Sequence, residues 1–354
     1  MRILWDFRLF SLGYGRRGIG AWTGRVAAAY IASKPAADLV IWGDRAACPP
    51  ASGSWHVDWI PYRPAGWKRD LIAIPALLRR HNIDIMHYWV ALGPLWRIGM
   101  GLWHPCRTVA TVYDLGAEYW TGVPNCASVH RTWYWRAQKR LARAINRFIC
   151  ISETTRADLL RLMPGADARV IRTPPPPPLL PAPGGRRTYL LALGSAPNKN
   201  LRAAVAAFSR LRADFPEYTL VVCGDIDKQW ELPGAVPPGV TFESMEHYGR
   251  HLCRAAVLVF CSTHEGLGLP PIEAMAAGCP VVAADIPALH ETCGTAARFA
   301  DPHDPDAVAA AITEVIRNRE DWTARSRRGW ERWNEMSRNT GDDLACIYRE
   351  LRPA

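Results

Sequence analysis

Short apolar runs alternate along the whole chain with longer stretches in which apolar residues recur at helical spacing. The apolar runs predict β-strands over residues 2–6, 39–42, 83–87, 108–113 and 147–151, and again over 189–193, 219–223, 255–260 and 281–284. The amphipathic stretches predict helices over residues 23–32, 70–81, 205–211 and 307–317, followed by a polar helical stretch to Leu351. Strands and helices that alternate in this way are typical of α/β proteins, in which helices cover both faces of a parallel sheet.

A proline-rich segment interrupts this pattern near the middle of the chain. Residues 174–185 read Pro-Pro-Pro-Pro-Pro-Leu-Leu-Pro-Ala-Pro-Gly-Gly, which suits neither a regular helix nor a central strand. At 354 residues the chain is also long for one domain. We therefore predict two domains, over residues 1–173 and 188–332, joined by a stiff linker over residues 174–187.

Composition limits the class of protein. Hydrophobic residues make up 49% and charged residues 21% of the chain, as in ordinary globular proteins. No apolar run approaches the roughly 18 residues needed to span a bilayer, and the chain starts directly with a strand rather than a secretory leader. The ten cysteines lack metal-binding spacing and are expected to be reduced. These features predict a cytoplasmic protein.

Charge is distributed unevenly between the two halves. Residues 1–172 contain 24 Lys and Arg against 11 Asp and Glu, a net charge of +13, together with 12 of the 16 Trp. The remainder contains 19 against 22, a net charge of −3. A basic, Trp-rich half favours an anionic membrane surface or an acidic carbohydrate as a partner. Nucleic acid would suit the charge, but no nucleic-acid-binding motif accompanies it.

The clearest chemistry lies in residues 262–280, Ser-Thr-His-Glu-Gly-Leu-Gly-Leu-Pro-Pro-Ile-Glu-Ala-Met-Ala-Ala-Gly-Cys-Pro. The segment connects two predicted strands, and its two adjacent prolines and Gly278 suit the start and the end of a short helix. Glu265 would then lie in the loop and Glu273 in the first helical turn. In open α/β sheets, ligands bind beyond the carboxyl ends of the strands, where helix N-termini favour anions. Carboxylates beside an anion site suit sugar hydroxyls, and a nucleotide sugar supplies both groups.

This segment resembles the Glu-x7-Glu signature of retaining, nucleotide-sugar-dependent glycosyltransferases of family 4, which include many bacterial mannosyltransferases. The resemblance covers the pattern Ser-x-x-Glu-Gly-x-Gly-x-Pro-x-x-Glu-Ala-Met-Ala-x-Gly-x-Pro-Val. It implies the GT-B fold, in which two Rossmann-like domains face a cleft and a C-terminal helix, about residues 333–354, crosses back to the N-terminal domain. The N-terminal domain would bind the acceptor and the C-terminal domain the nucleotide sugar.

The resemblance also implies roles for individual residues. Glu265 would lie beside the transferred sugar, and Glu273 would accept hydrogen bonds from the ribose hydroxyls. Gly266, Gly268 and Leu269 would offer backbone N–H groups to the diphosphate or the sugar, because glycine lets the backbone approach a ligand closely.

A second loop, Gly194-Ser195-Ala196-Pro197-Asn198-Lys199-Asn200, resembles the family's Gly-Arg-x-x-Pro-x-Lys-Asn loop. Lys199 matches the lysine that neutralises the leaving diphosphate. Ser195 stands where the family has arginine, and the loop is one residue shorter, but Gly194 and Ser195 are still expected at the donor. The alternative for Lys199 is a solvated lysine at the start of a helix.

The N-terminal half carries the candidates for the acceptor side. Gly13-Tyr14-Gly15-Arg16-Arg17-Gly18 matches Gly-x-Gly-x-x-Gly. We discount a nicotinamide dinucleotide, because a helix is not expected before Ala21 and no acidic partner is well placed. Gly18-Ile19-Gly20 is similar to a Gly-Ile-Gly loop that the family has near the acceptor. Arg16 and Arg17 either hold a phosphate or are solvated loop charges.

Other candidates follow predicted strands. Tyr113 stands where the family often has a histidine near the transferred sugar, and Asp114 either orients the site or caps a helix. His87 is equally well explained as a buried structural histidine. Ser152 matches the family's Ser-x-x-Ser/Thr pattern, although an N-cap explains it without any function.

Two basic, Trp-containing stretches are candidates for contact with an anionic bilayer. One extends over residues 131–147 and the other over residues 67–80. Many basic helices are simply solvated, and this alternative stays open for both.

Together these features predict a retaining hexosyltransferase of bacterial cell-surface polysaccharide synthesis, which includes lipopolysaccharide. By resemblance, the expected donor is GDP-mannose or a related GDP-sugar, with a UDP-sugar as the alternative. The expected acceptor is a glycan or a lipid-linked molecule, at the inner face of the cytoplasmic membrane. No metal or other cofactor is expected. The competing classes are a non-catalytic sugar-nucleotide-binding or scaffold protein and, less directly, a nucleic-acid binder.

Overall fold

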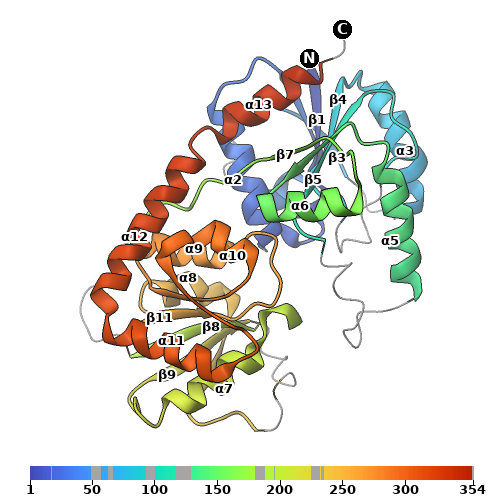
Figure 1. Ribbon diagram of the computed structural model, residues 1–354. Helices are drawn as coiled ribbons and strands as arrows, with labels where there is room; N and C mark the ends of the chain where they lie inside the picture. The colour runs from blue at the N-terminus through green and yellow to red at the C-terminus, as the bar shows by residue number, and fades with distance from the viewer. Residues whose placement is uncertain are drawn as a thin grey trace. The chain divides into compact units, whose positions relative to one another are not determined.

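The chain divides into two α/β units in the computed structural model (Figure 1). Unit 1 comprises Met1–Pro174 with Ser337–Ala354, and unit 2 comprises Pro175–Met336. The structure describes residues 1–16, 18–48, 57–62, 67–92, 100–115, 129–179, 188–194, 196–224, 232 and 235–352. Arg17 and Ser195, both predicted site residues, lie outside these ranges, and the side chain of Arg16 is also outside what is described.

Seven parallel strands form the sheet of unit 1, in the order β3-β2-β1-β4-β5-β6-β7. Their bounds are β1 Arg2–Asp6, β2 Asp38–Gly43, β3 Asp58–Pro61, β4 Ile85–Tyr88, β5 Arg107–Val112, β6 Arg147–Cys150 and β7 Ala168–Val170. The five strands predicted in this half are confirmed, with ends that differ by up to two residues. The prediction missed β3 and β7, which lie at the two edges of the sheet, are only partly buried and lack a continuous apolar run.

Helices cover both faces of this sheet (Figure 1). The described helices are α1 Arg8–Ser11, α2 Gly18–Ala32, α3 Trp67–Arg80, α5 Val129–Ala142, α6 Glu153–Leu162 and α13 Thr340–Glu350, with short 3₁₀ turns η1 Tyr14–Arg16 and η2 Arg45–Ala47. Helices α3, α5 and α6 pack on one face through residues such as Leu78, Trp135 and Leu159. Helix α2 packs with α13 on the other face.

Helix α2 begins at Gly18, earlier than predicted. We expected no helix before Ala21, because glycine disfavours helix. Its first turn instead packs directly on the preceding loop: a Cβ atom at Gly20 would lie 2.5 Å from the Cα atom of Gly15. The Gly-x-Gly-x-x-Gly segment therefore does lead straight into a helix, and that reason for discounting a dinucleotide loop was wrong.

The C-terminal helix α13 is fastened to the central strands of unit 1 by a buried chain of hydrogen bonds. The Trp5 indole N–H donates to the Tyr348 hydroxyl (2.9 Å), which lies 2.6 Å from Nδ1 of His87. Nε2 of His87 lies 2.9 Å from the Thr111 hydroxyl. Donor and acceptor needs are met if Tyr348 donates to Nδ1 and the neutral ring donates from Nε2. His87 is thus the buried structural histidine, and the predicted return of the C-terminal helix to the N-terminal domain is confirmed.

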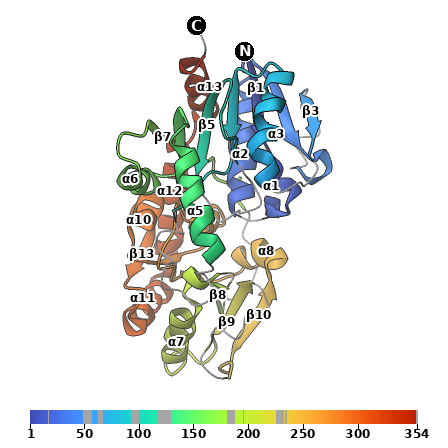
Figure 2. The same cartoon turned by 90° about the vertical axis from the view of Figure 1, so that its right-hand side faces the viewer.

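Unit 2 contains six parallel strands, in the order β10-β9-β8-β11-β12-β13, of which Figure 2 shows β8, β9 and β10 side by side. Their bounds are β8 Tyr189–Gly194, β9 Thr219–Gly224, β10 Val240–Ser244, β11 Val257–Phe260, β12 Val281–Ala284 and β13 Ala297–Ala300. The four predicted strands are confirmed. The prediction missed the two edge strands β10 and β13, whose exposed positions carry polar side chains such as Thr241 and Arg298.

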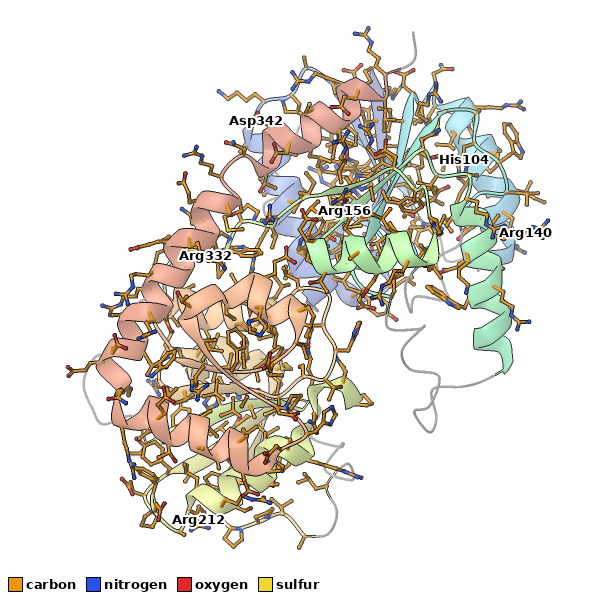
Figure 3. The ribbon with its side chains drawn as sticks, in the orientation of Figure 1. His104, Arg140, Arg156, Arg212, Arg332 and Asp342 are labelled. Atoms are coloured by element: carbon orange, nitrogen blue, oxygen red, sulfur yellow. The ribbon has the colours of Figure 1, made fainter. Side chains whose placement is uncertain are left out.

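The helices of unit 2 are α7 Leu201–Leu211, α8 Tyr248–Leu252, α9 Leu269–Ala276, α10 Pro287–Cys293, α11 Pro305–Arg317 and α12 Arg319–Met336, with 3₁₀ turns η4 Pro197–Lys199, η6 Met245–His247 and η7 Gly294–Ala296. Helices α7 and α11 share one apolar core with the sheet, and α8, α9 and α10 share the other. The Arg332 guanidinium of α12, labelled in Figure 3, donates to the carbonyls of Glu291 and Thr292 at the end of α10. The predicted C-terminal helical stretch is therefore two helices, of which α12 belongs to unit 2 and α13 to unit 1.

Part of the proline-rich segment packs on unit 2. Residues 171–179 form neither helix nor strand. The N–H of Leu179 donates to the carbonyl of Ala276 (2.9 Å), and the indole of Trp330 donates to the carbonyl of Pro176 (3.0 Å). These bonds tie the segment to α9 and α12. The remainder of the predicted linker, residues 180–187, lies outside the described residues.

Burial of His87 predicts a pH dependence of stability. Burial lowers the pKa of His87 to about 3, below the ordinary value of 6.5. Between about pH 6.5 and pH 3 the unfolded chain therefore binds a proton at this residue that the folded chain does not. The contribution of neutral His87 to the free energy of unfolding is complete above about pH 6.5 and is lost as the pH falls toward 3. From about pH 7.5 to pH 5 the loss is about 2 kcal/mol of unfolding free energy.

The variant His87→Gln should lose stability less steeply over this range than the wild type, as measured by urea unfolding at both pH values. His104, whose pKa is lowered to about 4 by burial, contributes to the slope of both proteins and does not affect the comparison. Identical slopes for the two proteins would contradict the assignment of His87 as a buried neutral residue.

Candidate functional site

The strand order of unit 2 reverses between β8 and β11. From β8 the chain proceeds to β9 and β10 on one side, and then returns to β11 on the other side of β8. The loops that leave the carboxyl ends of these two strands diverge, and such switch points are where open α/β sheets bind ligands. Lys199 follows β8 and Glu265 follows β11. The fold therefore brings the two principal predicted residues to the same edge of the sheet.

The side chains of Lys199 and Glu265 form an ion pair. The Lys199 Nζ atom lies 2.5 Å from Oε1 of Glu265, and the side chains are only 15% and 12% exposed. The same ammonium group lies 4.8 Å from the centre of the Phe260 ring, which is buried at the end of β11. Lys199 is therefore not a solvated lysine at a helix start: a carboxylate and an aromatic face both hold its charge in place.

Asn198 ties the two loops together, and the sequence analysis missed it. Its backbone carbonyl accepts from the N–H of Thr263 (2.9 Å), and its side-chain Nδ2 donates to the carbonyl of His264 (2.9 Å). On the other side, the hydroxyl of Thr292 donates to the carbonyl of Leu267 (2.6 Å). The Glu265 loop is thus held at both ends. An asparagine between Pro197 and Lys199 gives no sequence signal for this role, because its partners are backbone atoms far along the chain.

The start of helix α9 follows the Glu265 loop and has glycine as its N-cap residue. Gly268 is the N-cap residue, with φ +99°, and a Cβ atom there would lie 2.5 Å from Cδ2 of Leu289. Pro270 and Pro271 have no N–H, so the helix leaves the N–H groups of Gly268 and Leu269 as its N-terminal donors. The glycine is required both by backbone conformation and by space.

Glu273 lies half-buried in the second turn of α9, not in the first turn as predicted. The helix starts at Leu269, one residue before the expected start at Pro270, so Glu273 is its fifth residue. Gly266 lies in the short loop before the helix, directly after Glu265.

Gly194 lies where β8 ends, close to the end of β9. A Cβ atom at Gly194 would lie 2.9 Å from Cγ1 of Val222, and one at Gly224 would lie 2.8 Å from the carbonyl carbon of Gly194. These two glycines let the strand ends approach each other at the edge where the ligand site is expected. Ser195, the next residue, lies outside the described residues.

The candidates of unit 1 gather at the carboxyl ends of β1 and β5. The Tyr113 hydroxyl lies 2.5 Å from the Thr23 hydroxyl, which donates to the carbonyl of Ile19 in the first turn of α2. Tyr113 is 7% exposed, and burial raises the pKa of its phenol well above the ordinary value. Its hydroxyl therefore braces the Gly18–Gly20 turn. Asp114, next along the chain, is half-buried.

Ser152 is an N-cap: its side chain accepts from the N–H of Thr155 (2.9 Å) at the start of α6. This contact supports the structural alternative for the residue.

A buried charge cluster near the end of β1 had no sequence signal. The Arg8 guanidinium, which is fully buried, donates to both oxygens of Asp6 (2.7 and 2.6 Å) and to Asp70 at the start of α3. Its Cζ atom lies 4.1 Å from the centre of the Trp42 ring. The cluster fastens α3 to the segment that follows β1.

The two basic stretches form the surface helices α3 and α5. Arg136, Arg140 and Arg143 of α5 are exposed, whereas Trp135 is 9% exposed and packs into the core. Side chains before Trp135 on α5, and those of Trp67 and Lys68 on α3, lie outside what is described. Among the described residues, no helix is long and apolar enough to cross a membrane.

Comparisons with known proteins concern the family and the fold of the chain. Residues 187–318 match the family model described as glycosyl transferases group 1, and residues 34–176 match the model described as glycosyltransferase family 4. Both halves of the chain thus carry domains of these enzymes, and the chain belongs to the family 4, group 1 glycosyltransferases.

The curated relatives are bacterial mannosyltransferases. The chain is 33% identical over 140 residues to the O-antigen chain mannosyltransferase RfbU of Salmonella typhimurium, a match that spans 37% of this chain and 39% of that protein. It is 27% identical over 271 residues to the MMP alpha-(1->4)-mannosyltransferase of Mycolicibacterium hassiacum, spanning 67% and 63% of the two chains.

Solved structures share the fold over the whole chain. Anabaena Alr3699/HepE, solved in complex with UDP and glucose, has a TM-score of 0.72 at 15% identity, covering 99% of this chain and 100% of that chain. Sucrose-phosphate synthase from Thermosynechococcus elongatus has a TM-score of 0.71 at 18% identity, covering 99% of each chain. The predicted GT-B fold is confirmed.

The geometry at Gly268 predicts a stability effect that does not depend on any ligand. Gly268→Ala forces an alanine into a left-handed conformation and pushes its Cβ atom into Leu289, so we expect unit 2 to lose about 2–4 kcal/mol of unfolding free energy. A second substitution, Leu289→Ala, should remove the steric part of the cost of the glycine substitution but not the backbone part. Urea unfolding measures both.

The matched control is Gly249→Ala in helix α8, where a Cβ atom would have nothing within 4 Å and φ is not positive. This variant should be as stable as the wild type or slightly more stable. The same stability for Gly268→Ala and Gly249→Ala would show that the α9 N-terminus is not built as described.

Proposed function

We propose that the protein transfers a hexose from a nucleotide diphosphate sugar to a glycan or lipid-linked acceptor, with retention of the anomeric configuration. Unit 2 binds the donor and unit 1 binds the acceptor. The observation that carries the proposal is the Lys199–Glu265 pair at the switch point of unit 2, followed within four residues by the donor N–H groups of Gly268 and Leu269 at the start of α9. A cation, a carboxylate and a helix N-terminus are the groups that a sugar diphosphate requires.

Each group has a role in the proposed reaction. When the bond between the anomeric carbon and the diphosphate oxygen breaks, its electron pair goes to the phosphate oxygen. The Lys199 ammonium and the N–H groups of Gly268 and Leu269 stabilise this negative charge. Glu265 contacts the sugar and stabilises the positive charge that develops on the ring, and Glu273 binds the ribose hydroxyls. No metal is needed in this scheme, because Lys199 supplies the cation.

On the acceptor side, the hydroxyl attacks the anomeric carbon from the face that the diphosphate leaves, and its proton passes to the departing phosphate oxygen. Asp114 orients the acceptor. The Gly18–Gly20 turn, with Arg16 and Arg17 before it, contacts a phosphate of the acceptor.

We propose GDP-mannose or a related GDP-sugar as the donor and bacterial cell-surface polysaccharide as the product. The mannosyltransferase relatives, including the O-antigen enzymes, support this choice. The alternative is a UDP-sugar, because structural neighbours at low identity were solved with UDP or UDP-glucose. The acceptor is expected at the cytoplasmic face of a membrane.

A donor panel tests the class of donor. GDP-mannose at about one hundred times its Kd should stabilise the protein by about 2.7 kcal/mol, which raises the melting temperature by several degrees. UDP-glucose should raise it less, and EDTA should change neither result. A larger shift with UDP-sugars would instead support the alternative donor. Binding without slow hydrolysis, and without transfer to any acceptor, would favour a non-catalytic protein.

Substitutions of the ion pair test the site. Lys199→Ala removes the cation that stabilises the leaving diphosphate, so kcat/KM for sugar transfer should fall at least about 100-fold, and Lys199→Arg should recover part of the loss. Glu265→Ala should also lower transfer by far more than a few-fold. Lys34→Ala, at an exposed position of unit 1, is the matched control and should leave transfer unchanged. Transfer by Glu265→Ala within a few-fold of wild type would refute the site.

A further inference from the structure

Helix α3 presents an unusual exposed stripe. Between residues 69 and 80, the exposed positions are Arg69, Ile72, Ala73, Ala76, Arg79 and Arg80, which recur at helical spacing. Arginines therefore stand at both ends of the stripe and apolar residues in its middle. The one carboxylate in this range, Asp70, is 2% exposed and bonded to buried Arg8, so the stripe itself carries only positive charge.

The segment before β5 adds two more apolar side chains to this surface. Ile72 is 76% exposed, Leu102 is 61% exposed and Trp103 is 43% exposed. The Cζ atom of Arg79 lies 4.5 Å from the centre of the Trp103 ring, which places the indole at the stripe. Among the described residues of unit 1, these three are the large hydrophobic side chains that are exposed.

A proline inside α3 explains how this segment is held. Pro75 has no N–H, so it cannot donate to the carbonyl of Leu71 one turn earlier. The N–H of Leu102 donates to that carbonyl instead (3.0 Å). Gly101 lies close against Ile74, and its N–H donates to the buried Tyr88 hydroxyl (3.1 Å). Leu102 and Trp103 are thus fixed beside the helix rather than exposed on a loose loop.

Helix α5 lies on the same face of the sheet as α3 and adds positive charge (Figure 2). Arg136, Arg140 and Arg143 are exposed on it, and Figure 3 shows Arg140 pointing outward. Its described apolar residues, such as Trp135 and Ala142, are buried in the core. The apolar side chains of this face therefore belong to α3 and the neighbouring segment, and the charge extends across both helices.

We propose that this face of unit 1 docks on the surface of an anionic lipid bilayer. Ile72, Leu102 and Trp103 enter the interface between head groups and acyl chains, where an indole ring is especially favourable. The arginines of α3 contact lipid phosphates, and those of α5 add longer-range attraction. The proposal goes beyond the transferase reaction, because it rests on this surface alone and would hold for any acceptor.

Charge and geometry together favour a bilayer over another occupant. A helix surface that carries isolated apolar side chains between arginines at its two ends matches an anionic interface. A protein partner would be expected to meet a broader apolar patch with few charges at its centre.

Flotation with lipid vesicles tests the proposal, using the full chain without donor or acceptor. We expect binding to vesicles of one part phosphatidylglycerol to two parts phosphatidylcholine, with little binding to phosphatidylcholine alone. The triple variant Ile72→Ser/Leu102→Ser/Trp103→Ser should reduce binding at least tenfold. The variant Arg69→Gln/Arg79→Gln/Arg80→Gln should do the same, and salt should weaken binding of the wild type.

Two control variants separate this surface from general charge and hydrophobicity. Arg349→Gln/Arg352→Gln removes exposed charges on and just after α13, a helix of the opposite sheet face, and Met245→Ser removes an exposed apolar side chain of unit 2. Both should bind as the wild type does. Brominated lipid should quench the tryptophan fluorescence of the wild type more strongly than that of the Trp103→Leu variant, because the Trp103 indole enters the interface.

Three outcomes would overturn the proposal. The first is that the triple serine variant, with an unchanged melting temperature, binds vesicles as strongly as the wild type does. The second is equal binding to anionic and neutral vesicles. The third is a concentration-dependent dimer that the triple variant abolishes, because the occupant would then be a second copy of the chain. Since no donor is present, failure here would leave the proposed transfer reaction intact, and loss of transfer would not affect vesicle binding.

Discussion

The contact between the Lys199 ammonium and the Glu265 carboxylate depends on the way the sheet of unit 2 is wound. The two residues are 66 positions apart and meet because β8 and β11 are neighbours in the sheet. Parallel strands bring their carboxyl ends to one edge, and the reversal of strand order lets the two loops diverge there. Asn198 then sets the separation of the loops through bonds to backbone atoms. The cation and the carboxylate are therefore held in position before any ligand arrives, at the cost of two largely buried charges that stabilise each other.

Much of this organisation could be predicted from the sequence, because apolar runs mark central strands and glycine and proline mark the turns. The two-unit α/β fold and the nine central strands followed from such patterns. The Lys199 loop and the role of Glu265 were predicted from their resemblance to the motifs of the family. Edge strands escaped prediction, since half of each faces solvent and no continuous apolar run forms. The start of α2 was placed too late because helix propensity counts against glycine, whereas Gly20 is needed for close contact with Gly15.

The interactions that could not be predicted are those whose partners are distant in the chain or belong to the backbone. Asn198 contacts two peptide groups, and nothing in its neighbours in sequence indicates this. Arg8 looks like an ordinary charged residue after a strand, but it is fully buried between two aspartates because Asp70, 62 positions later, starts the helix above it. Tyr113 replaces a histidine of the family pattern, and only the structure shows that its hydroxyl is used to brace α2. Local sequence patterns therefore predict helices and strands well, but they do not predict which distant residues contact one another.

Pro75 illustrates a trade-off that a sequence-based redesign would overlook. Judged by helix propensity, it is an obvious residue to replace with alanine, since proline inside a helix costs about 3 kcal/mol. In this protein the missing N–H leaves the Leu71 carbonyl to accept a hydrogen bond from Leu102. A restored helical N–H would compete for that carbonyl, and the segment with Leu102 and Trp103 would lose part of its attachment. A stabilising substitution of the helix would thus loosen the neighbouring surface, so the imperfect helix is what gives that surface a defined shape.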